Sequence, residues 1–545
     1  MSPEARDRRL TLVAAIIGSV VVFVDGTVVN VALPAIRADL GGGLAGQQWL
    51  TDAYLLTLGS LLLIGGSLGD LYGRRRAFRL GLAGFGITSL VCALAPSEPS
   101  LIVARGLQGM TGALLVPNTL GLIVARFEAH ERGAAIGSWT AWAGIAMVIG
   151  PLAGGLILAV ASWRWVFAVN LVPIATAYLI AGRLSDAHDH PVGGAVDLVG
   201  ASLCALGLGG PVFALIEEPA HGWASPTILS PLLGGLGLLG AFVVWERRAA
   251  HPMLELSLFA ERNFAVGNAA TLAVYAGLAS VPFFLILFLQ QVAGYSPLGA
   301  GAAMLPVTVI MFALSRRFGA LADRFGPRLF MGVGPLLAAA GIALLTRLDA
   351  RGQYVGAVLP AILVFGLGLS LTVAPLTATV LGGVDERHAG IASAVNNAIA
   401  RVAGLLAVAA IGATVSAQFH STLDTRLSSS ALAPGSPARR VIAQARDRPL
   451  SGGAGAASGL PLGPRMAVAD AVDGASVAAL HLAMELVAAL MIIGGLLSAA
   501  GIRNPRRQVA ACDCLGGAVV GASREAPGLN VAPRPRAPAP APARG

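Results

Sequence analysis

Long apolar segments recur along most of the chain and are separated by short polar connections. Each segment is long enough to cross about 30 Å of hydrocarbon as a helix. Fourteen such runs can be counted, at about 10–33, 48–70, 77–95, 101–125, 133–160, 164–183, 197–217, 227–247, 265–290, 298–315, 328–347, 355–381, 388–416 and 474–502. This pattern predicts an all-α membrane protein with 14 transmembrane helices, because backbone polar groups in lipid need partners within the protein.

The composition supports this class and excludes others. The chain is 56% hydrophobic and only 12% charged, about half the charged share of a soluble domain. It contains no lysine. Because a Walker A loop requires a lysine, this excludes an ATP-driven pump within the one chain. No GxSxG, HExxH or metal-spaced His/Cys cluster is found, so we expect no enzyme, no metal and no cofactor. The net charge of +9 is expected to report membrane topology rather than nucleic-acid binding.

Arginine positions predict the orientation in the membrane. If the N-terminus lies in the cytoplasm, the short outer connections hold only Arg37, Arg164, Arg347 and Arg351, and the inner connections hold many more. This bias follows the positive-inside rule and places both termini in the cytoplasm. Residues 417–473, rich in Ser, Gly, Ala and Pro, are expected to form a flexible outer segment with, at most, short helices. Residues 503–545 are expected to be a disordered Pro/Ala-rich tail.

One cytoplasmic loop occurs twice. GGSLGDLYGRRR at 65–76 has a near copy, GALADRFGPR, at 319–328, which indicates a duplicated membrane unit. Each copy places an acid beside arginines at the end of a span, and we expect contacts between the two halves to latch the outward-open state. The alternative is that the basic residues only fix topology. The residues of this gate motif are Gly66, Asp70, Gly73, Arg74, Arg75, Asp323, Arg324 and Gly326.

Two charged residues inside predicted spans are the sharpest candidates for proton or substrate coupling. Asp25 lies near the middle of the first span, where a charge costs several kcal/mol and should face a cavity or a partner. There it either takes up and releases protons or serves as a hydrogen-bonded structural residue. Arg105, near the outer end of the fourth span, stays charged and can only tune a carboxylate or position water. Its alternative is a helix-end arginine that reaches the headgroups.

Further charged residues are weaker candidates. Asp52 lies near the outer end of the second span beside aromatic residues; it is a coupling candidate, although an interfacial position is favoured. Glu485 follows His481 by one helical turn, so the two share a helix face and form either a proton relay or a structural pair. Arg401 in the thirteenth run is interpreted as a packing or interface residue.

The fifth run contains a local break in its helical pattern. Gly150-Pro151 predicts a kink, because proline removes a backbone donor and clashes with the preceding turn. Gly154 and Gly155 would give this helix a smooth contact face. We expect a bent, tightly packed helix that seals an interface between helix bundles.

Several of these motifs together resemble the major facilitator superfamily, and within it the fourteen-span drug:proton antiporter branch. The first loop matches G-x-L-x-D-x-x-G-R-R, with Leu71 where many members have arginine. LIVARGLQGMTGA at 101–113 resembles R-x-x-Q-G-x-x-G-A, and GPLAGG at 150–155 resembles the antiporter motif of the fifth span. DGTVVNVALP at 25–34 and WRWVFAVN at 163–170 are also typical of this branch.

The resemblance implies two six-helix bundles around a central cavity, at residues 1–183 and 251–502, with two linker spans within 184–250. It also implies a role for Arg105 in proton transfer and for the fifth span in exchange of drug for protons. We therefore expect a multidrug efflux transporter in the bacterial plasma (inner) membrane. We expect it to export lipophilic small molecules, to be driven by the proton gradient and to be a monomer. A narrow exporter of one antibiotic, lipid or peptide remains open, as does a non-transporting receptor on this fold.

Overall fold

The structure of the protein is a computed structural model. It describes residues 3–184, 196–250, 252–382, 384, 389–428, 436–446, 448–453, 457 and 459–504. All regular elements in these ranges are helical. The tail expected to be disordered lies, from residue 505 onward, outside the described residues.

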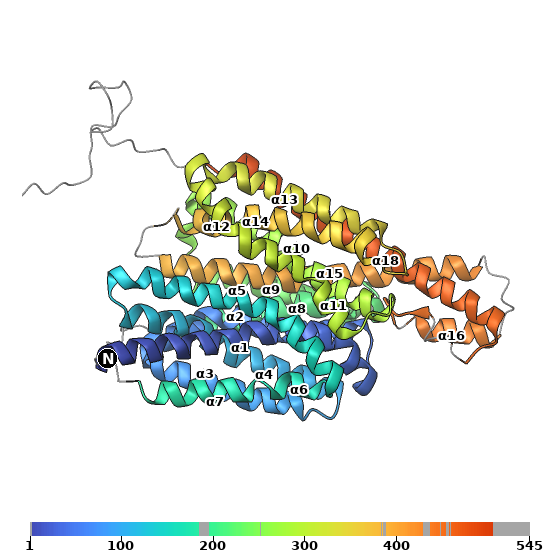
Figure 1. Cartoon of the computed structure of the whole chain (residues 1–545), viewed down its shortest axis with the longest axis horizontal. Coiled ribbons are helices and arrows are strands. Elements are labelled where there is room, and N and C mark those ends of the chain that lie inside the picture. The colour runs from blue at the N-terminus through green and yellow to red at the C-terminus, as the bar shows by residue number, and fades with distance from the viewer. Residues whose placement is uncertain are drawn as a thin grey trace, which may run out of the picture. The chain divides into compact units, whose positions relative to one another are not determined.

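The helices of the first half form what we call the N-terminal group, in blue and cyan in Figure 1. Short turns join most of them, so neighbours in sequence run antiparallel. They are α1 (Pro3–Leu40), α2 (Leu44–Tyr72), α3 (Arg74–Ala93), α4 (Glu98–Arg126), α5 (Ala129–Val160), α6 (Arg164–Ala168) and α7 (Leu171–Gly182).

Two helices, α8 (Leu198–His221) and α9 (Pro226–Glu246), pack against each other, and α8 also packs on α2 and α15. The remaining helices form the C-terminal group, in green to red in Figure 1. They are η1 (Leu256–Ala260), α10 (Arg262–Gln291), α11 (Pro297–Ala303), α12 (Leu305–Phe325), α13 (Pro327–Leu344), η2 (Leu345–Arg347), η3 (Tyr354–Val358), α14 (Leu359–Gly382), α15 (Ala389–Ser428), α16 (Pro437–Ala445) and α18 (Leu462–Gly501).

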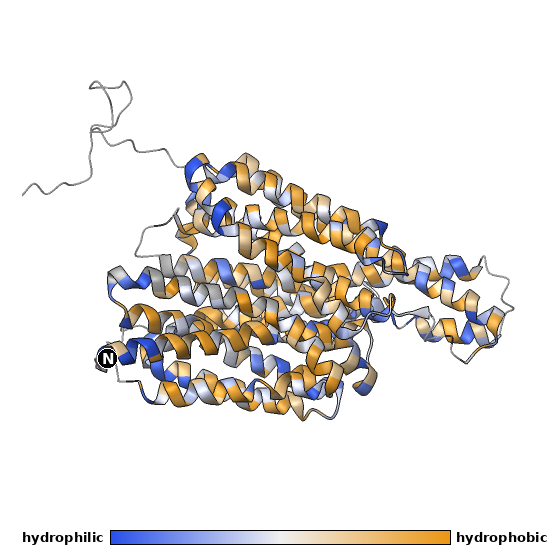
Figure 2. Ribbon diagram, in the orientation of Figure 1, coloured by the Kyte–Doolittle hydropathy of each residue, from blue (hydrophilic) through white to orange (hydrophobic). Residues whose placement is uncertain are grey.

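The predicted all-α membrane fold is confirmed. Every predicted apolar run is helical, and 13 helices among the described residues are long and apolar enough to cross a membrane. The predicted run at 133–160 lies within the 32-residue helix α5, of which the described residues include the apolar segment Ile149–Val160. Orange, apolar residues dominate the long helices in Figure 2, while blue residues gather near their ends.

Glycines set two features of this fold. Gly73 between α2 and α3 and Gly326 between α12 and α13 have φ of 93° and 90°, so both copies of the duplicated loop use the tight turn that glycine favours. A side chain at Gly65 would collide with the backbone of Ala113, so this position allows α2 and α4 to approach closely.

We call the side of the helices that holds the turns at Gly73 and Gly326 the Gly73 side. The opposite side, with the turn at Gly42, is the Gly42 side.

The segment 417–473 differs from the flexible structure predicted for it. α15 and α18 are each 40 residues long, or about 60 Å at 1.5 Å per residue, twice the thickness of the hydrocarbon. Their ends extend past α11 beside α16 in Figure 1. Buried apolar residues hold these ends together, among them Phe419, Ile442 and Val468. The Ala-rich sequence is helical there because it finds an apolar surface to cover.

Candidate functional site

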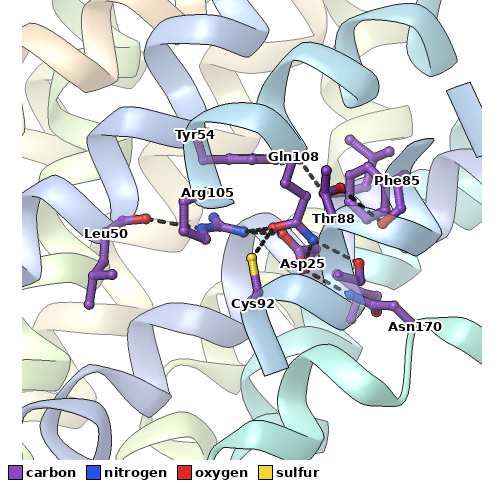
Figure 3. A network of polar contacts seen from close by, with 12 residues as sticks. Asp25, Leu50, Tyr54, Phe85, Thr88, Cys92, Arg105, Gln108 and Asn170 are labelled. Atoms are coloured by element: carbon purple, nitrogen blue, oxygen red, sulfur yellow. Dashed lines mark hydrogen bonds and ion pairs between the residues drawn. The ribbon is translucent and has the colours of Figure 1, made fainter. Parts of the chain in front are cut away.

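Asp25 lies inside the N-terminal group, where it is fully buried (0% exposed). Its carboxylate accepts three hydrogen bonds: from Arg105 at 2.5 Å, from Gln108 at 3.0 Å and from Asn170 at 2.9 Å. Figure 3 shows these side chains converging on the carboxylate. Three hydrogen-bond donors, one of them a cation, are enough to stabilise the negative charge of a buried carboxylate. In this conformation Asp25 therefore meets a partner rather than an open cavity.

Arg105 is also buried (1% exposed) and is held from several directions. Besides Asp25, its guanidinium donates to the carbonyl of Leu50 at 3.0 Å and to Oε1 of Gln108 at 2.6 Å. It lies 4.2 Å from the ring centroid of Tyr54, a cation–π contact. Arg105 is thus no headgroup-facing residue, and its contact with Asp25 matches the predicted ability to tune a carboxylate.

The network ties five segments of the N-terminal group together, because the bond from Arg105 to Leu50 adds α2. Arg105 and Gln108 are one turn apart on α4, so both reach Asp25 of α1 from the same helix face. The amide of Gln108 also donates to Ser89 of α3 at 2.9 Å. Asn170 belongs to the turn between α6 and α7. Gln108 and Asn170 were not among the predicted site residues, although polar side chains within apolar runs could have marked both.

The direction of Asp25 follows from its place on α1. Asp25 and Phe23 are separated by about 200° around the helix. Phe23 faces α15, because its ring lies 6.0 Å from the guanidinium of Arg401. Asp25 accordingly points away from the C-terminal group. A proton on Asp25 would change contacts within the N-terminal group first.

Asp52 is not joined to this network. It is fully buried (0% exposed), and neither carboxylate oxygen has a hydrogen-bond partner among the described residues. The favoured interfacial position is therefore wrong. Gln48, one turn earlier on α2, donates to the carbonyl of Val408 on α15 at 2.6 Å, and Gly59 packs on Arg401. Asp52 lies between them, on the face of α2 that meets the C-terminal group.

Glu485 is placed differently from the predicted relay. Its side chain is exposed on α18, on the face that also exposes Ile492 and Leu496. The ring of His481 contacts the carbonyl of Leu348 at 2.8 Å, and no contact with Glu485 is recorded. The two residues share a helix but not a hydrogen bond, because the histidine finds a backbone acceptor on a neighbouring element. The structure does not bring Glu485 near Asp25 or Asp52.

The gate residues make contacts within their own groups. Arg74 pairs with Asp70 at 2.9 Å and donates to the carbonyl of Gly121 at 2.9 Å. Arg75 donates to the carbonyls of Ala181 and Gly182 at the end of α7. In the second copy, beside Asp323 and Arg324, Arg328 donates to the carbonyl of Ala499 at 2.6 Å.

The antiporter motif of α5 does not end that helix, which continues through Pro151 from Ala129 to Val160. Its glycines make the predicted close contacts. A side chain at Gly150 would collide with Thr27, and one at Gly154 would press on Val28. One at Gly155 would strike the backbone of α11 at Leu298. α5 thus packs against α1 on one face and against the C-terminal group on the other.

Among the described residues, no three His, Cys, Asp or Glu side chains are grouped as a metal site would need. The buried network itself brings a carboxylate and a guanidinium together. One carboxylate can exchange a proton while a permanent cation stays beside it.

The chain matches the family model of the Major Facilitator Superfamily over residues 15–408. It is 39% identical over 407 residues to the puromycin resistance protein of Streptomyces alboniger, covering 73% of this chain and 80% of that protein. It is 36% identical over 424 residues to the probable actinorhodin transporter of Streptomyces coelicolor, covering 75% and 73%. It is 33% identical over 425 residues to the multidrug resistance protein Stp of Mycobacterium tuberculosis, covering 77% and 78%.

Solved structures share the fold at low identity. A bacterial homologue of the human lysosomal transporter Spinster, in an inward-facing and occupied conformation, gives a TM-score of 0.63 at 17% identity and covers 91% of this chain and 97% of its own. A D-xylose-proton symporter gives a TM-score of 0.54 at 16% identity, covering 74% and 89%. By its sequence and its fold, the chain belongs to the Major Facilitator Superfamily.

Proposed function

We propose that this protein exports hydrophobic small molecules from a bacterial cell in exchange for protons, by alternating access across the inner membrane. The observation that carries the proposal is the buried ion pair of Asp25 and Arg105 in a chain of this family. Charges inside a membrane are costly and usually serve transport or proton movement. The names of the relatives, which concern resistance and export, support small molecules as the cargo.

Protonation of Asp25 supplies the coupling step. A neutral carboxyl loses most of its attraction for Arg105 and can donate one hydrogen bond of its own. The guanidinium then keeps Leu50 and Gln108 as neutral acceptors and has no anionic partner in the network. Because the network joins α1, α3, α4 and the α6–α7 turn, this change loosens the packing of α1, and α1 also contacts the C-terminal group through Gln290.

Asp52 is the second carboxyl in the proposed cycle. It has no hydrogen-bond partner among the described residues in this conformation, so the neutral form fits its surroundings. Movement of α2 against α15 would change those surroundings, because Asp52 lies on the contact face between the two. One carboxyl is therefore paired and the other unpaired in the same state, which suits a cycle that takes up and releases protons at different steps.

The remaining features of the proposal concern energy and orientation. The arginine distribution supports cytoplasmic termini, which makes the Gly73 side cytoplasmic. The membrane potential contributes about 2.3 kcal/mol per charge per 100 mV, so no nucleotide or cofactor is needed. We propose that a monomer carries out the cycle.

The test uses inside-out vesicles with an imposed proton gradient and a pH-sensitive dye. Lipophilic cations, neutral antibiotics and acidic aromatic compounds are added in turn to wild type and to Asp25→Asn. We expect cargo-dependent proton release by the wild type and none by the variant. Asp39→Asn is the matched control, since Asp39 also lies on α1 and pairs with an arginine, Arg164, but is exposed. If no compound moves protons in folded wild-type protein, the proton-exchange proposal fails.

The same panel decides the breadth of the cargo. Two relatives from Streptomyces are named for single compounds, puromycin and actinorhodin, which favours a narrow exporter for self-resistance as the second candidate. Proton release by one chemical class alone would support it. Release by several unrelated classes would support multidrug efflux.

A further inference from the structure

A polar cavity of about 810 Å³ lies on the Gly42 side, a size within the roughly 300–1,000 Å³ of small-molecule sites. It is separate from the Asp25 network. The N-terminal group contributes the end of α1 and the following turn, and the C-terminal group contributes the end of α10 and the segment around α16. The lining residues are Arg37, Gly42, Gly43, Gln291, Val441, Gln444, Ala445, Arg448, Ser451 and Gly452.

The charge of this cavity is positive. Arg37 and Arg448 both line it, and none of the acidic residues that the structure describes does. The two guanidinium groups are close enough to repel each other electrostatically. Arg37 donates to Oε1 of Gln291 at 2.5 Å, a neutral acceptor, and no side-chain partner of Arg448 is found in the part of the chain that the structure describes. Two cations that share a cavity with no anion among the described lining residues leave room for a bound counter-charge.

Acids near the cavity are engaged elsewhere or lie at its edge. Asp39 pairs with Arg164 at 2.5 Å, and Asp473 accepts from the backbone of Gly453 at 2.7 Å. Glu98 lies against Gly42, at the rim. None of these carboxylates lines the cavity, so the positive charge inside it is not neutralised from within the described chain.

Two further donors lack partners at the same place. Nε2 of Gln291 and Oγ of Ser451 are buried and have no hydrogen-bond partner within the described ranges. An amide nitrogen can only donate, and a hydroxyl can donate. Because Arg37 occupies Oε1 of Gln291, the amide is oriented with its nitrogen free to donate. The cavity thus offers two guanidinium groups, whose N–H groups match the acceptors of an oxyanion, and the buried amide and hydroxyl lie beside it on two of its lining residues.

We propose that this cavity binds an oxyanion, a phosphate or carboxylate group, between Arg37 and Arg448. The ligand is a free anion or the headgroup of an anionic lipid, since both present the same oxygens. Because the site takes residues from both groups of helices, the bound anion stabilises the conformation in which the groups meet on the Gly42 side. It is released when α1 and α10 separate there.

The experiment measures binding of inorganic phosphate to the purified full-length protein by equilibrium dialysis, at constant ionic strength. Arg448 is exposed, so Arg448→Gln should leave the fold intact. We expect this variant to weaken phosphate binding about tenfold or more, as loss of a charge-assisted hydrogen bond predicts. Arg37→Lys keeps the charge but loses the planar fork, and we expect a smaller loss. The matched control is Arg446→Gln, which removes the same charge from the same segment but from a residue paired with Asp424.

A second arm identifies the source of the oxyanion. Thermal unfolding is compared in nanodiscs of phosphatidylcholine and in nanodiscs that also contain phosphatidylglycerol. Stabilisation by the anionic lipid that Arg448→Gln abolishes assigns the headgroup, and stabilisation by phosphate alone assigns the free anion. The proposal is overturned if neither probe binds or stabilises the wild type. It is equally overturned if Arg446→Gln weakens binding as much as Arg448→Gln.

Discussion

Asp25 and Arg105 should behave as a buried ion pair whose members cannot be removed singly. Asp25→Asn leaves the guanidinium of Arg105 buried without a counter-ion. Breaking such a pair costs about 3–5 kcal/mol. Two carbonyl-type acceptors and the ring of Tyr54 remain around the guanidinium, so we expect the lower end, about 3 kcal/mol.

The double variant separates this effect from a general loss of packing. With Asp25→Asn and Arg105→Gln together, no uncompensated charge remains, and amide donors and acceptors replace the ions. We expect a coupling free energy of about 2–3 kcal/mol between the two positions. Asp39→Asn again serves as the control, because its exposed pair with Arg164 should contribute no more than about 1 kcal/mol.

The measurement is reversible unfolding of the purified variants in mixed micelles, followed by tryptophan fluorescence. The free energy of unfolding is compared for wild type, the two single variants, the double variant and the control. If the two single effects add, or if Asp25→Asn costs no more than Asp39→Asn, the reasoning from a buried ion pair is refuted. Transport assays on the same samples then report the role of the charge apart from stability.

Three further predictions test other parts of the molecule. Asp52→Asn should leave unfolding free energy unchanged or raised, since its carboxylate has no partner, and a loss of several kcal/mol would contradict this. Asp70→Asn should cost under about 1 kcal/mol, because its pair with Arg74 is exposed; a gate role requires that transport nevertheless falls. Gly155→Val should abolish transport, because a side chain there strikes α11. The control Gly237→Val should not, because the space around Gly237 is open. Equal transport activity of the two variants would exclude the α5–α11 contact from the cycle.

The helices could be predicted from the sequence because membrane spans are encoded locally. Each apolar run carries its own length and hydropathy, and every predicted run is helical. The turns at Gly73 and Gly326 were equally local, since the glycine and its flanking arginines stand next to each other in the sequence. α5 continues through Pro151, as a helix can where neighbouring groups compensate for the missing hydrogen bond, and the kink expected there stays a prediction.

The contacts between distant residues could not be derived in the same way. Nothing near Asp25 in the sequence states which face of α1 meets α4, so its pairing with Arg105 depended on three-dimensional packing. Burial of Asp52 depended on α15, which lies far along the chain. The helical extensions of α15 and α18 were not predicted, because a segment rich in Ser, Gly and Ala is typical of flexible loops. Such a segment becomes helical when it packs against a partner.

The hydrogen bonds that join the two groups of helices indicate which state of the cycle this structure represents. Arg37 donates to Gln291, Gln48 donates to the carbonyl of Val408, and Gln290 donates to the carbonyl of Val31. All three lie in the half of the molecule nearer the Gly42 side. The recorded contacts of the duplicated loops, in contrast, stay within each group. With the proposed orientation, this is a conformation closed toward the outside. A latch formed in the opposite state would then be made only after the Arg37–Gln291 contact, and the oxyanion site beside it, have opened.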